Sequence, residues 1–398
     1  MAFPKTQVVL ALIFIFFTSS SFAITHNVLN YGAKPDGKAD STKAFLAAWN
    51  HACSSRTPTT IHVPAGRFLL RNVIFRGKCN NDAILIRIDG IIVAPSDYHV
   101  IGHEESWILL ENVDGISVSG GVLDGQGTGL WNCKATYKKC PKGATSLRFI
   151  DSSNIVIEGL TSLNSQKFHI VIHGCQNVKV EGVRISASGE SPNTDGIHVQ
   201  LSSAVTILNS KIGTGDDCIS ISPGSTDVWI ENIACGPGHG ISIGSLGMDF
   251  HEPGVQNVTV KAVVFRGTQN GVRIKSWAKP STGFAKNILF QNAVMFDVHN
   301  PIVIDQNYCP HSKNCPHQES GVKVTDVAYK NIRGTSATEV AVRFDCSKKN
   351  PCTGIRLEAV ELTYKNKPAD ASCRNADGTA SGWIQPASCL LYEMIDYM

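Results

Sequence analysis

Four short clusters of polar residues lie in the middle of this 398-residue chain. They are Asn193-Thr194-Asp195-Gly196, Gly215-Asp216-Asp217-Cys218, Gly238-His239-Gly240 and Arg273-Ile274-Lys275. Asp217 follows Asp195 by 22 residues, and His239 follows Asp217 by another 22. A period of about 20 to 30 residues is typical of a solenoid, in which residues one period apart stack on neighbouring coils. The spacing therefore predicts three carboxylates and a histidine in one patch, with two cations on a following coil.

These residue types suit proton transfer beside an acidic ligand. Three carboxylates that lie close together cannot all ionise easily, so one pKa should rise into the range of a general acid. Arg273 and Lys275 alternate with Ile274, so on a strand they share one face while Ile274 enters the core. We expect two exposed cations in a cleft, which fit a carboxylated sugar because a guanidinium can hold a carboxylate with two hydrogen bonds.

The neighbouring residues Asp216 and Asp217 would point to opposite faces of a regular strand. Both can serve one cleft only where the backbone bends. We expect Gly213 and Gly215 to permit that bend through their conformational freedom.

The elements that must position these residues are short strands. Runs that alternate apolar and mixed positions recur along the chain, and Asn, Asp or Gly tends to stand at the turn that starts each run. The runs cover residues 115–118, 154–157, 177–180, 204–207, 227–230, 257–260, 287–290, 326–329 and 354–357. One coil cannot bury its own apolar face, so many coils must stack. The pattern favours an all-β fold, a right-handed parallel β-helix over residues 24–389, rather than an irregular β-sandwich.

Capping segments are expected at both ends of the solenoid. Within residues 37–53, Asp40 or Ser41 can cap a helix whose apolar positions are Ala44, Phe45, Ala48 and Ala52. Such a helix would cover the open end of the sheet and prevent pairing with other chains. At the other end, the segment between Cys373 and Cys389 is expected to tie down the last coil, and residues 390–398 are expected to be loosely ordered.

The amino terminus resembles a secretion signal. Residues 1–23 carry one charge, Lys5, before an apolar run over residues 8–17 and small residues that end at Ala23. A membrane anchor is the competing interpretation, but the run is shorter than the roughly 20 residues that a spanning helix needs. The formal net charge is +3, and no long run of Lys and Arg is present, which excludes a strongly basic nucleic-acid binder. We expect a secreted, extracellular protein with no membrane partner.

The 13 cysteines fit an oxidising compartment. Sequence proximity suggests pairs between Cys53 and Cys79, Cys133 and Cys140, Cys218 and Cys235, Cys309 and Cys315, Cys346 and Cys352, and Cys373 and Cys389. Cys175 is left over and should behave as a small buried hydrophobe. Zinc binding is the alternative, but the chain contains no CxxC pair. The only N-x-Ser/Thr sequon, Asn257-Val258-Thr259, allows one glycan, although an unmodified turn asparagine is the competing interpretation.

In this order, the four clusters resemble the signature of the polygalacturonases of glycoside hydrolase family 28. A fifth element, Tyr308 in Asp305-Gln306-Asn307-Tyr308-Cys309, is also present. Residues 31–37 and 235–247 resemble the plant branch, and the similarity covers residues 26–389. The resemblance implies a secreted enzyme of the plant cell wall (the apoplast) that hydrolyses α-1,4-galacturonosyl linkages of homogalacturonan in pectin. It implies an acidic polysaccharide as partner, no metal and no cofactor, and we expect a monomer.

The resemblance also assigns roles to single residues. It implies Asp216 as the general acid, and Asp195 and Asp217 as the pair that positions and deprotonates water with inversion at the sugar carbon. His239 either tunes proton traffic by bonding to Asp216 or Asp217 or holds the shape of the site. The substrate-binding residues that it implies are Asn193, Arg273, Lys275 and Tyr308. It also implies a disulfide between Cys218 and Cys235, while Trp277 suits either sugar stacking or packing.

Other interpretations of the same residues remain open. A cluster of aspartates can bind Ca²⁺ instead of moving protons. A polysaccharide lyase on the same architecture would eliminate rather than hydrolyse, and a non-catalytic pectin-binding module would need no intact site. Internal or terminal attack on the polymer depends on loops at the ends of the groove, and we expect internal attack.

Overall fold

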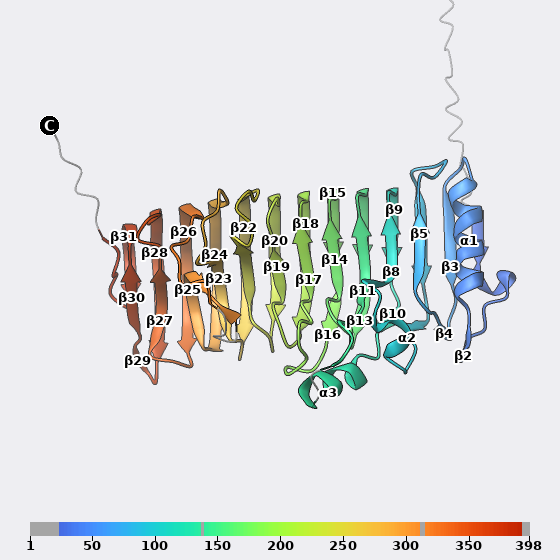
Figure 1. Cartoon of the computed structure of the whole chain (residues 1–398), viewed down its shortest axis with the longest axis horizontal. Coiled ribbons are helices and arrows are strands. Elements are labelled where there is room, and N and C mark those ends of the chain that lie inside the picture. The colour runs from blue at the N-terminus through green and yellow to red at the C-terminus, as the bar shows by residue number, and fades with distance from the viewer. Residues whose placement is uncertain (1–23, 137–138, 311–314, 392–398) are drawn as a thin grey trace, which may run out of the picture.

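The computed structural model describes residues 24–136, 139–310 and 315–391. In these ranges the chain winds into stacked coils of parallel strands (Figure 1), so the predicted parallel β-helix is confirmed. Among the described strands only β29 pairs with its neighbour, β28, in an antiparallel manner. The predicted signal peptide, residues 1–23, lies outside the described residues. Within them, no helix is long and apolar enough to cross a membrane.

Two sheets form the walls of the solenoid. The larger sheet has 20 strands: β1 (Ile24–Asn27), β2 (Asp36–Asp40), β3 (Thr59–Val63), β4 (Arg67–Leu69), β6 (Ile84–Ile88), β7 (Ile91–Val93), β9 (Asp114–Ser119), β10 (Val122–Asp124), β12 (Ser153–Glu158), β13 (Thr161–Leu163), β15 (Gln176–Glu181), β16 (Arg184–Ser186), β18 (Ser203–Gly213), β20 (Thr226–Cys235), β22 (Val255–Arg266), β24 (Phe284–Val298), β26 (Lys323–Ser336), β28 (Cys352–Tyr364), β29 (Lys367–Pro368) and β31 (Ala376–Gln385). The smaller sheet has 11 strands: β5 (Val73–Arg76), β8 (Ser106–Glu111), β11 (Thr145–Ile150), β14 (Ile170–His173), β17 (Ile197–Gln200), β19 (Ile219–Ile221), β21 (Ile241–Leu246), β23 (Asn270–Trp277), β25 (Asn300–Tyr308), β27 (Val340–Asp345) and β30 (Asp370–Arg374).

Rows of β-branched residues set the register of the larger sheet. Each strand-like run expected from the sequence lies in one of its strands. A single buried row runs through Ile116, Ile155, Val178, Val205, Val228, Val258, Ile288 and Val327. Because side chains alternate between faces, the residues between these positions point outwards. Stacking side chains of similar shape at every coil packs the interior closely.

Asparagines at the turn into each coil form a second, polar ladder. Asn154, Asn177, Asn257 and Asn287 all have φ between 54° and 57°, a left-handed conformation that Asn tolerates better than most residues. The Asn177 side-chain nitrogen donates to the Asn154 oxygen at 2.6 Å, and Asn287 donates to Asn257 at 2.8 Å. In turn, Asn257 donates to Asp227 at 2.9 Å, so its amide has a structural role whether or not the sequon is glycosylated.

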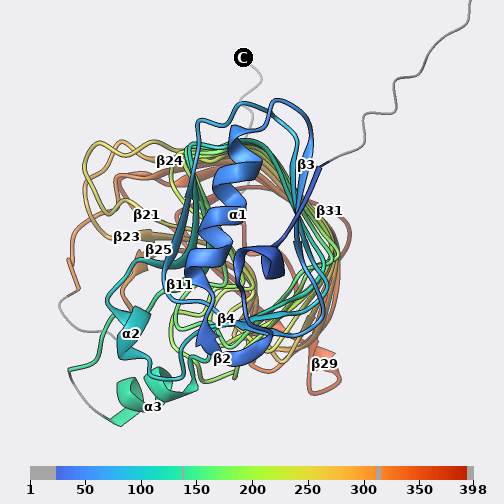
Figure 2. The ribbon, with the colours of Figure 1, turned by 90° about the vertical axis from the view of Figure 1, so that its right-hand side faces the viewer.

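A helix covers the amino-terminal end of the solenoid, as predicted. In Figure 2, α1 (Thr42–Ser54) crosses the open end of the coils. Its side chains Phe45 and Trp49 pack against Phe68 and Phe75, with ring centroids 6.0 and 5.0 Å apart. The cap comes from Asp40, whose carboxylate accepts from the Thr42 backbone N–H at 2.9 Å. The other helices are η1 (Val28–Tyr31), α2 (His99–Gly102) and α3 (Thr128–Thr136).

All six predicted disulfides form, and Cys175 is buried without a bond to another cysteine. Burial raises the pKa of the Cys175 thiol to about 11, so this thiol stays protonated and unreactive. The expectation of a loosely ordered tail is wrong for its first two residues. Leu390 is buried, and Leu391 exchanges backbone hydrogen bonds with Ala376 and Gly378 at 3.1 Å. Residues 392–398 lie outside the described ranges.

Removing the bond between Cys218 and Cys235 should destabilise the fold. The two cysteines are 17 residues apart, which corresponds to about 3 kcal/mol of loop-closure entropy in the unfolded chain. The double variant Cys218→Ala, Cys235→Ala should lose about that much free energy of unfolding in denaturant titrations.

The matched control is the pair Cys346 and Cys352, which closes a shorter loop with a separation of 6. Its double alanine variant should lose less, about 2 kcal/mol. A larger loss in the control than in the Cys218 and Cys235 variant would contradict the loop-entropy account.

Candidate active site

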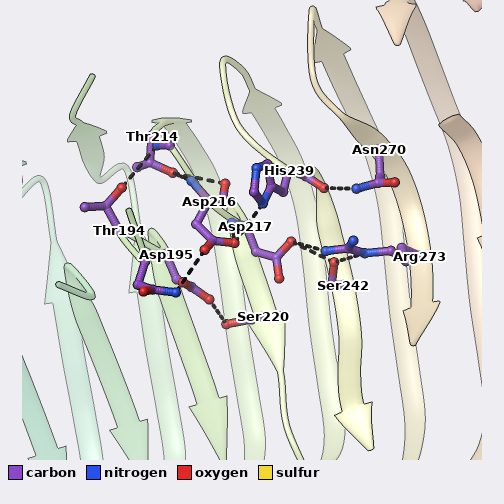
Figure 3. A network of polar contacts seen from close by, with 12 residues as sticks. Thr194, Asp195, Thr214, Asp216, Asp217, Ser220, His239, Ser242, Asn270 and Arg273 are labelled. Atoms are coloured by element: carbon purple, nitrogen blue, oxygen red, sulfur yellow. Dashed lines mark hydrogen bonds and ion pairs between the residues drawn. The ribbon is translucent and has the colours of Figure 1, made fainter. Parts of the chain in front are cut away.

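The smaller sheet brings the first three clusters together (Figure 3). Ile197, Ile219 and Ile241 pair in one register row of β17, β19 and β21. Asp195, Asp217 and His239 each stand two residues before a member of that row, so they stack on successive coils. The predicted 22-residue spacing therefore does place the carboxylates and the histidine in one patch.

A loop, rather than a strand, lets Asp216 and Asp217 both reach the site. The two residues lie between the end of β18 at Gly213 and the start of β19. Neither Gly213 nor Gly215 has a positive φ, so the expected role for their conformational freedom is wrong. Gly215 is needed for close approach instead. A Cβ atom there would lie 2.1 Å from the carbonyl oxygen of Ser191 on the preceding coil.

Asp217 is a buried carboxylate that two cations neutralise. Its Oδ1 accepts from Arg273 Nη2 at 2.9 Å and from Ser242 Oγ at 2.8 Å, and its Oδ2 accepts from Lys275 Nζ at 2.9 Å. Burial alone would raise the pKa of Asp217, but the charges of Lys275 and Arg273 outweigh burial and lower this pKa. Asp217 is therefore the member of the cluster that stays ionised.

The two cations differ from expectation in one respect. Arg273 and Lys275 lie on the predicted face, and Ile274 is buried in the core as predicted. Their side chains, however, are only 10% and 8% exposed, so the expectation of two exposed cations is wrong. Both side chains form ion pairs with Asp217 and are buried with it, because the Asp217 charge would be strongly unfavourable if it were buried without a partner.

Asp195 has the opposite electrostatic environment. It is 6% exposed, and its Oδ2 accepts from Ser220 Oγ at 2.7 Å. Burial raises the pKa of Asp195 well above its usual value of 3.8, and the negative charges of Asp216 and Asp217 add to the shift. The sequence predicted one raised pKa among the three carboxyl groups, and the structure assigns it to Asp195.

Asp216 is the most accessible of the three carboxylates, with 19% of its side chain exposed. Its Oδ1 lies 2.9 Å from His239 Nδ1 and accepts from the Asp217 backbone N–H at 2.8 Å. Its Oδ2 makes only a long contact of 3.4 Å with Asn193 Nδ2. Of the two partners considered for His239, the structure selects Asp216. Oδ2 is the oxygen left free to exchange a proton.

Two aromatic residues flank the cations. The Tyr308 ring lies 5.1 Å from Lys275 Nζ and 5.9 Å from the guanidinium carbon of Arg273. Trp277 packs edge-on against Tyr308 with ring centroids 5.5 Å apart. The sequence reasoning brought Tyr308 to the site correctly. The observed contact of Trp277 is one of packing, the second of the two roles considered for it.

The ligand atoms of Asp216, Asp217 and His239 lie within 4.8 Å of one another, which is close enough to hold a metal ion. The charges around Asp217 argue against a divalent cation at this point. Both Asp217 oxygens already accept from cationic side chains, and a metal would have to compete with them at short range.

The sequence reasoning missed three residues that support the carboxylates: His198, Ser220 and Ser242. They are also 22 residues apart, three positions after Asp195, Asp217 and His239, so the same period could have found them. His198 Nδ1 lies 2.8 Å from Ser220 Oγ, which donates its own hydrogen to Asp195. The Nδ1 atom is therefore the donor to Ser220. Burial lowers the pKa of His198 to about 4, so its ring is neutral at mildly acidic pH.

Glycoside hydrolases usually cleave their substrates with two carboxyl groups, one that donates a proton and one that activates water or attacks the sugar. The accessible carboxyl group of Asp216, the raised pKa of Asp195 and the ionised carboxylate of Asp217 fit that chemistry. The family model for the glycosyl hydrolases of family 28 matches residues 53–389. A polygalacturonase of Prunus persica is 63% identical over 98% of this chain and 100% of its own length. An exopolygalacturonase of Platanus acerifolia is 42% identical over 91% of this chain and 96% of its own length.

Among solved structures, the endo-xylogalacturonan hydrolase of Aspergillus tubingensis superposes with a TM-score of 0.77 and 25% identity. The match covers 87% of this chain and 98% of that chain. The chain therefore belongs to family 28 of the glycosyl hydrolases and is a glycoside hydrolase.

The pKa of Asp195 predicts a pH-dependent stability. Between the usual value of 3.8 and the raised value, the folded state binds a proton at Asp195 that the unfolded chain has lost. The contribution of this group is therefore present below 3.8 and is lost as the pH rises through the raised pKa. Asp195→Asn should be more stable than the wild type at neutral pH, and the difference should shrink as the pH falls towards 4.

Thermal unfolding across that pH range measures the difference. Asp249→Asn, at an exposed carboxylate, is the control and should show little difference from the wild type at any pH. A stability difference for Asp195→Asn that does not change with pH would show that the Asp195 carboxyl titrates normally.

Proposed function

We propose that the protein hydrolyses the α-1,4-galacturonosyl linkages of homogalacturonan in pectin, with inversion and with Asp216 as the proton donor. The proposal rests on the different environments of the three carboxyl groups. Asp217 is held ionised by Arg273 and Lys275, Asp195 has a raised pKa, and Asp216 is accessible. Family 28 membership and polygalacturonase relatives over nearly the whole chain support the substrate class.

In the proposed reaction, Asp216 Oδ2 gives its proton to the glycosidic oxygen as the bond to the anomeric carbon breaks. The long contact with Asn193 leaves this oxygen the freer of the two. His239 holds Oδ1 from the other side and positions the carboxyl group. Once the leaving sugar carries the proton, Asp216 is an anion, which the His239 imidazole can stabilise as a hydrogen-bond donor.

A water molecule attacks the anomeric carbon from the opposite face, and its proton passes to a carboxylate. For this step the proton of the cluster is on Asp216 and Asp195 is ionised, and Asp195 is then the stronger base of the two candidates, because basicity rises with pKa. Asp217, whose charge is shared with two cations, positions the water through its remaining lone pairs. The oxygen of the water becomes the new hydroxyl group, and proton return to Asp216 resets the enzyme.

Arg273 and Lys275 retain donors for the carboxylate of a galacturonate ring. Arg273 uses Nε on Ser242 and Nη2 on Asp217, and Lys275 uses one of its three N–H groups on Asp217. The Tyr308 ring lies beside both cations and can pack against the sugar. The same two cations thus keep Asp217 ionised and attract the acidic substrate.

The cellular setting is part of the proposal. Relatives from plants, a signal-like segment at residues 1–23 and six disulfides support a secreted protein that acts on pectin in the cell wall, and we propose that it is a monomer. We also propose internal attack on the polymer.

Hydrolysis of polygalacturonate tests the proposed function directly. Purified protein should release reducing ends without unsaturated products that absorb in the ultraviolet, and proton NMR of early products should show the β anomer. Unsaturated products would identify a lyase, a first-formed α anomer would rule out inversion, and no release of reducing ends would leave a binding protein.

Asp216→Asn should abolish most of this activity. The amide keeps the shape and the hydrogen bond to Asp217 N–H but cannot donate the proton, so kcat should fall by about a hundredfold to ten-thousandfold. KM should change little, because the binding cations remain in place. Initial rates on polygalacturonate, with unfolding curves to confirm the fold, measure the loss. A variant that keeps about a tenth of the wild-type kcat or more would assign the acid to another residue.

A further inference from the structure

A second polar pocket lies on the smaller sheet, on the coils of β11, β14 and β17, the last of which follows Asp195. It has a volume of about 410 Å³. Residues 103–105 after α2 and residues 142–143 after α3 supply its walls, and β11, β14 and β17 supply its floor; in Figure 2 both helices project beside β11. The residues that line it include Lys142, Arg148, Lys167, Phe168, Val171 and His198.

One register row connects this pocket to the active site. It runs through Arg148, Val171, His198, Ser220, Ser242 and Arg273 on successive strands. All of these side chains therefore belong to the same outer face, with an arginine at each end. Neighbouring strands are about 4.8 Å apart, so Arg148 lies about 10 Å across the sheet from His198 and about 24 Å from Arg273. A polymer bound across the carboxylates along this face would reach the pocket.

The guanidinium of Arg148 has unused binding capacity. Its Nη1 donates to Glu105 Oε2 at 2.5 Å, but the Glu105 side chain is 83% exposed. An ion pair with so exposed a partner contributes little and can be exchanged. The Nε atom of Arg148 is buried and has no hydrogen-bond partner among the described residues. A carboxylate that enters the pocket could replace Glu105 on the Nη atoms of the guanidinium.

Lys167 adds a second cation, which forms no ion pair with any carboxylate in the part of the chain that the structure describes. Its Nζ lies 4.7 Å from the centroid of the Phe168 ring, which stacks on His198 with centroids 4.9 Å apart. Burial lowers the pKa of Lys167, and the charge of Arg148 lowers it further. A bound anion would offset both effects. Phe168 and Val171 give the pocket an apolar surface suited to a sugar ring.

We propose that Lys142, Arg148 and Lys167 form a second carboxylate-binding subsite, which holds another uronate ring of the same polysaccharide while the bond at Asp216 is cleaved. The subsite rests on the proposed function, because its ligand is a more distant part of the same acidic chain. Glu104 and Glu105 at the rim leave the pocket with a net positive charge when its histidines are neutral. Binding at this distance favours attack within the polymer over attack at an end.

Arg148→Gln tests the subsite with oligogalacturonates from the trimer to the octamer. For the wild type, kcat/KM should rise with length until the chain spans the pocket. The variant should lose about tenfold in kcat/KM on the octamer, the effect of one charge-assisted hydrogen bond, and should match the wild type on the shortest oligomer that is cleaved. Equal effects on short and long oligomers, or no effect on either, would overturn the subsite.

Glu105→Gln is the matched control, since it removes the partner of Arg148 and keeps the arginine. If the pair serves structure, both variants should lose activity alike on every oligomer. If Arg148 binds substrate, Glu105→Gln should keep or raise kcat/KM on the octamer. A loss in Glu105→Gln equal to that in Arg148→Gln would therefore overturn the proposal.

Lys142→Gln provides a second, exposed position in the same pocket should Arg148→Gln fail to fold, and it should show the same selective loss on long oligomers. Failures of the two proposals are distinguishable. A wild-type protein that cleaves no oligogalacturonate would overturn the proposed function and the subsite with it. A wild-type protein that cleaves oligomers, with a kcat/KM that does not rise with length, would overturn the subsite alone.

Discussion

Parallel hydrogen bonds between β17, β19 and β21 hold three isoleucines of the smaller sheet in one row, and the site depends on that register. A slip of one residue would turn the side chains of the slipped strand to its other face and would move the loop before it by about 3.3 Å, so Asp195, Asp217 and His239 would no longer align. The buried β-branched rows of the larger sheet fix the same register from the other wall. The rigidity that general acid–base chemistry needs is thus a property of the whole stack rather than of local loops.

Opposite electrostatic environments within a few ångströms give the carboxyl groups different roles. Asp217 loses its tendency to bind a proton because Arg273 and Lys275 lie against it, and Asp195 gains one because it is buried with only a serine donor. The arrangement also makes the two groups interdependent. Weakening the ion pairs of Asp217 would raise its pKa and reduce the repulsion that helps to raise the pKa of Asp195.

The sequence predicted those features that depend on periodicity or on pairing. Spacing alone brought Asp217 and His239 together, strand alternation placed Ile274 in the core, and proximity along the chain found the disulfides. It could not predict which carboxyl group has the raised pKa, because that depends on burial and on the distance to Lys275. The sequence also predicted the wrong role for Gly215. The close approach of Ser191 from another coil cannot be read from the residues around Gly215.

Each asparagine of the turn ladder bonds only to the coils directly before and after it, as Asn257 does to Asp227 and Asn287. Its contribution to stability is therefore a nearest-neighbour energy, as expected of a one-dimensional stack. If a complete coil were inserted between two ladder members, its own asparagine could bond to the members on either side. An insertion of part of a coil would move the following asparagines out of line with the ladder. The length of this chain can therefore change only by whole coils, and changes outside β11 to β25 leave the strands of the pocket and of the site intact.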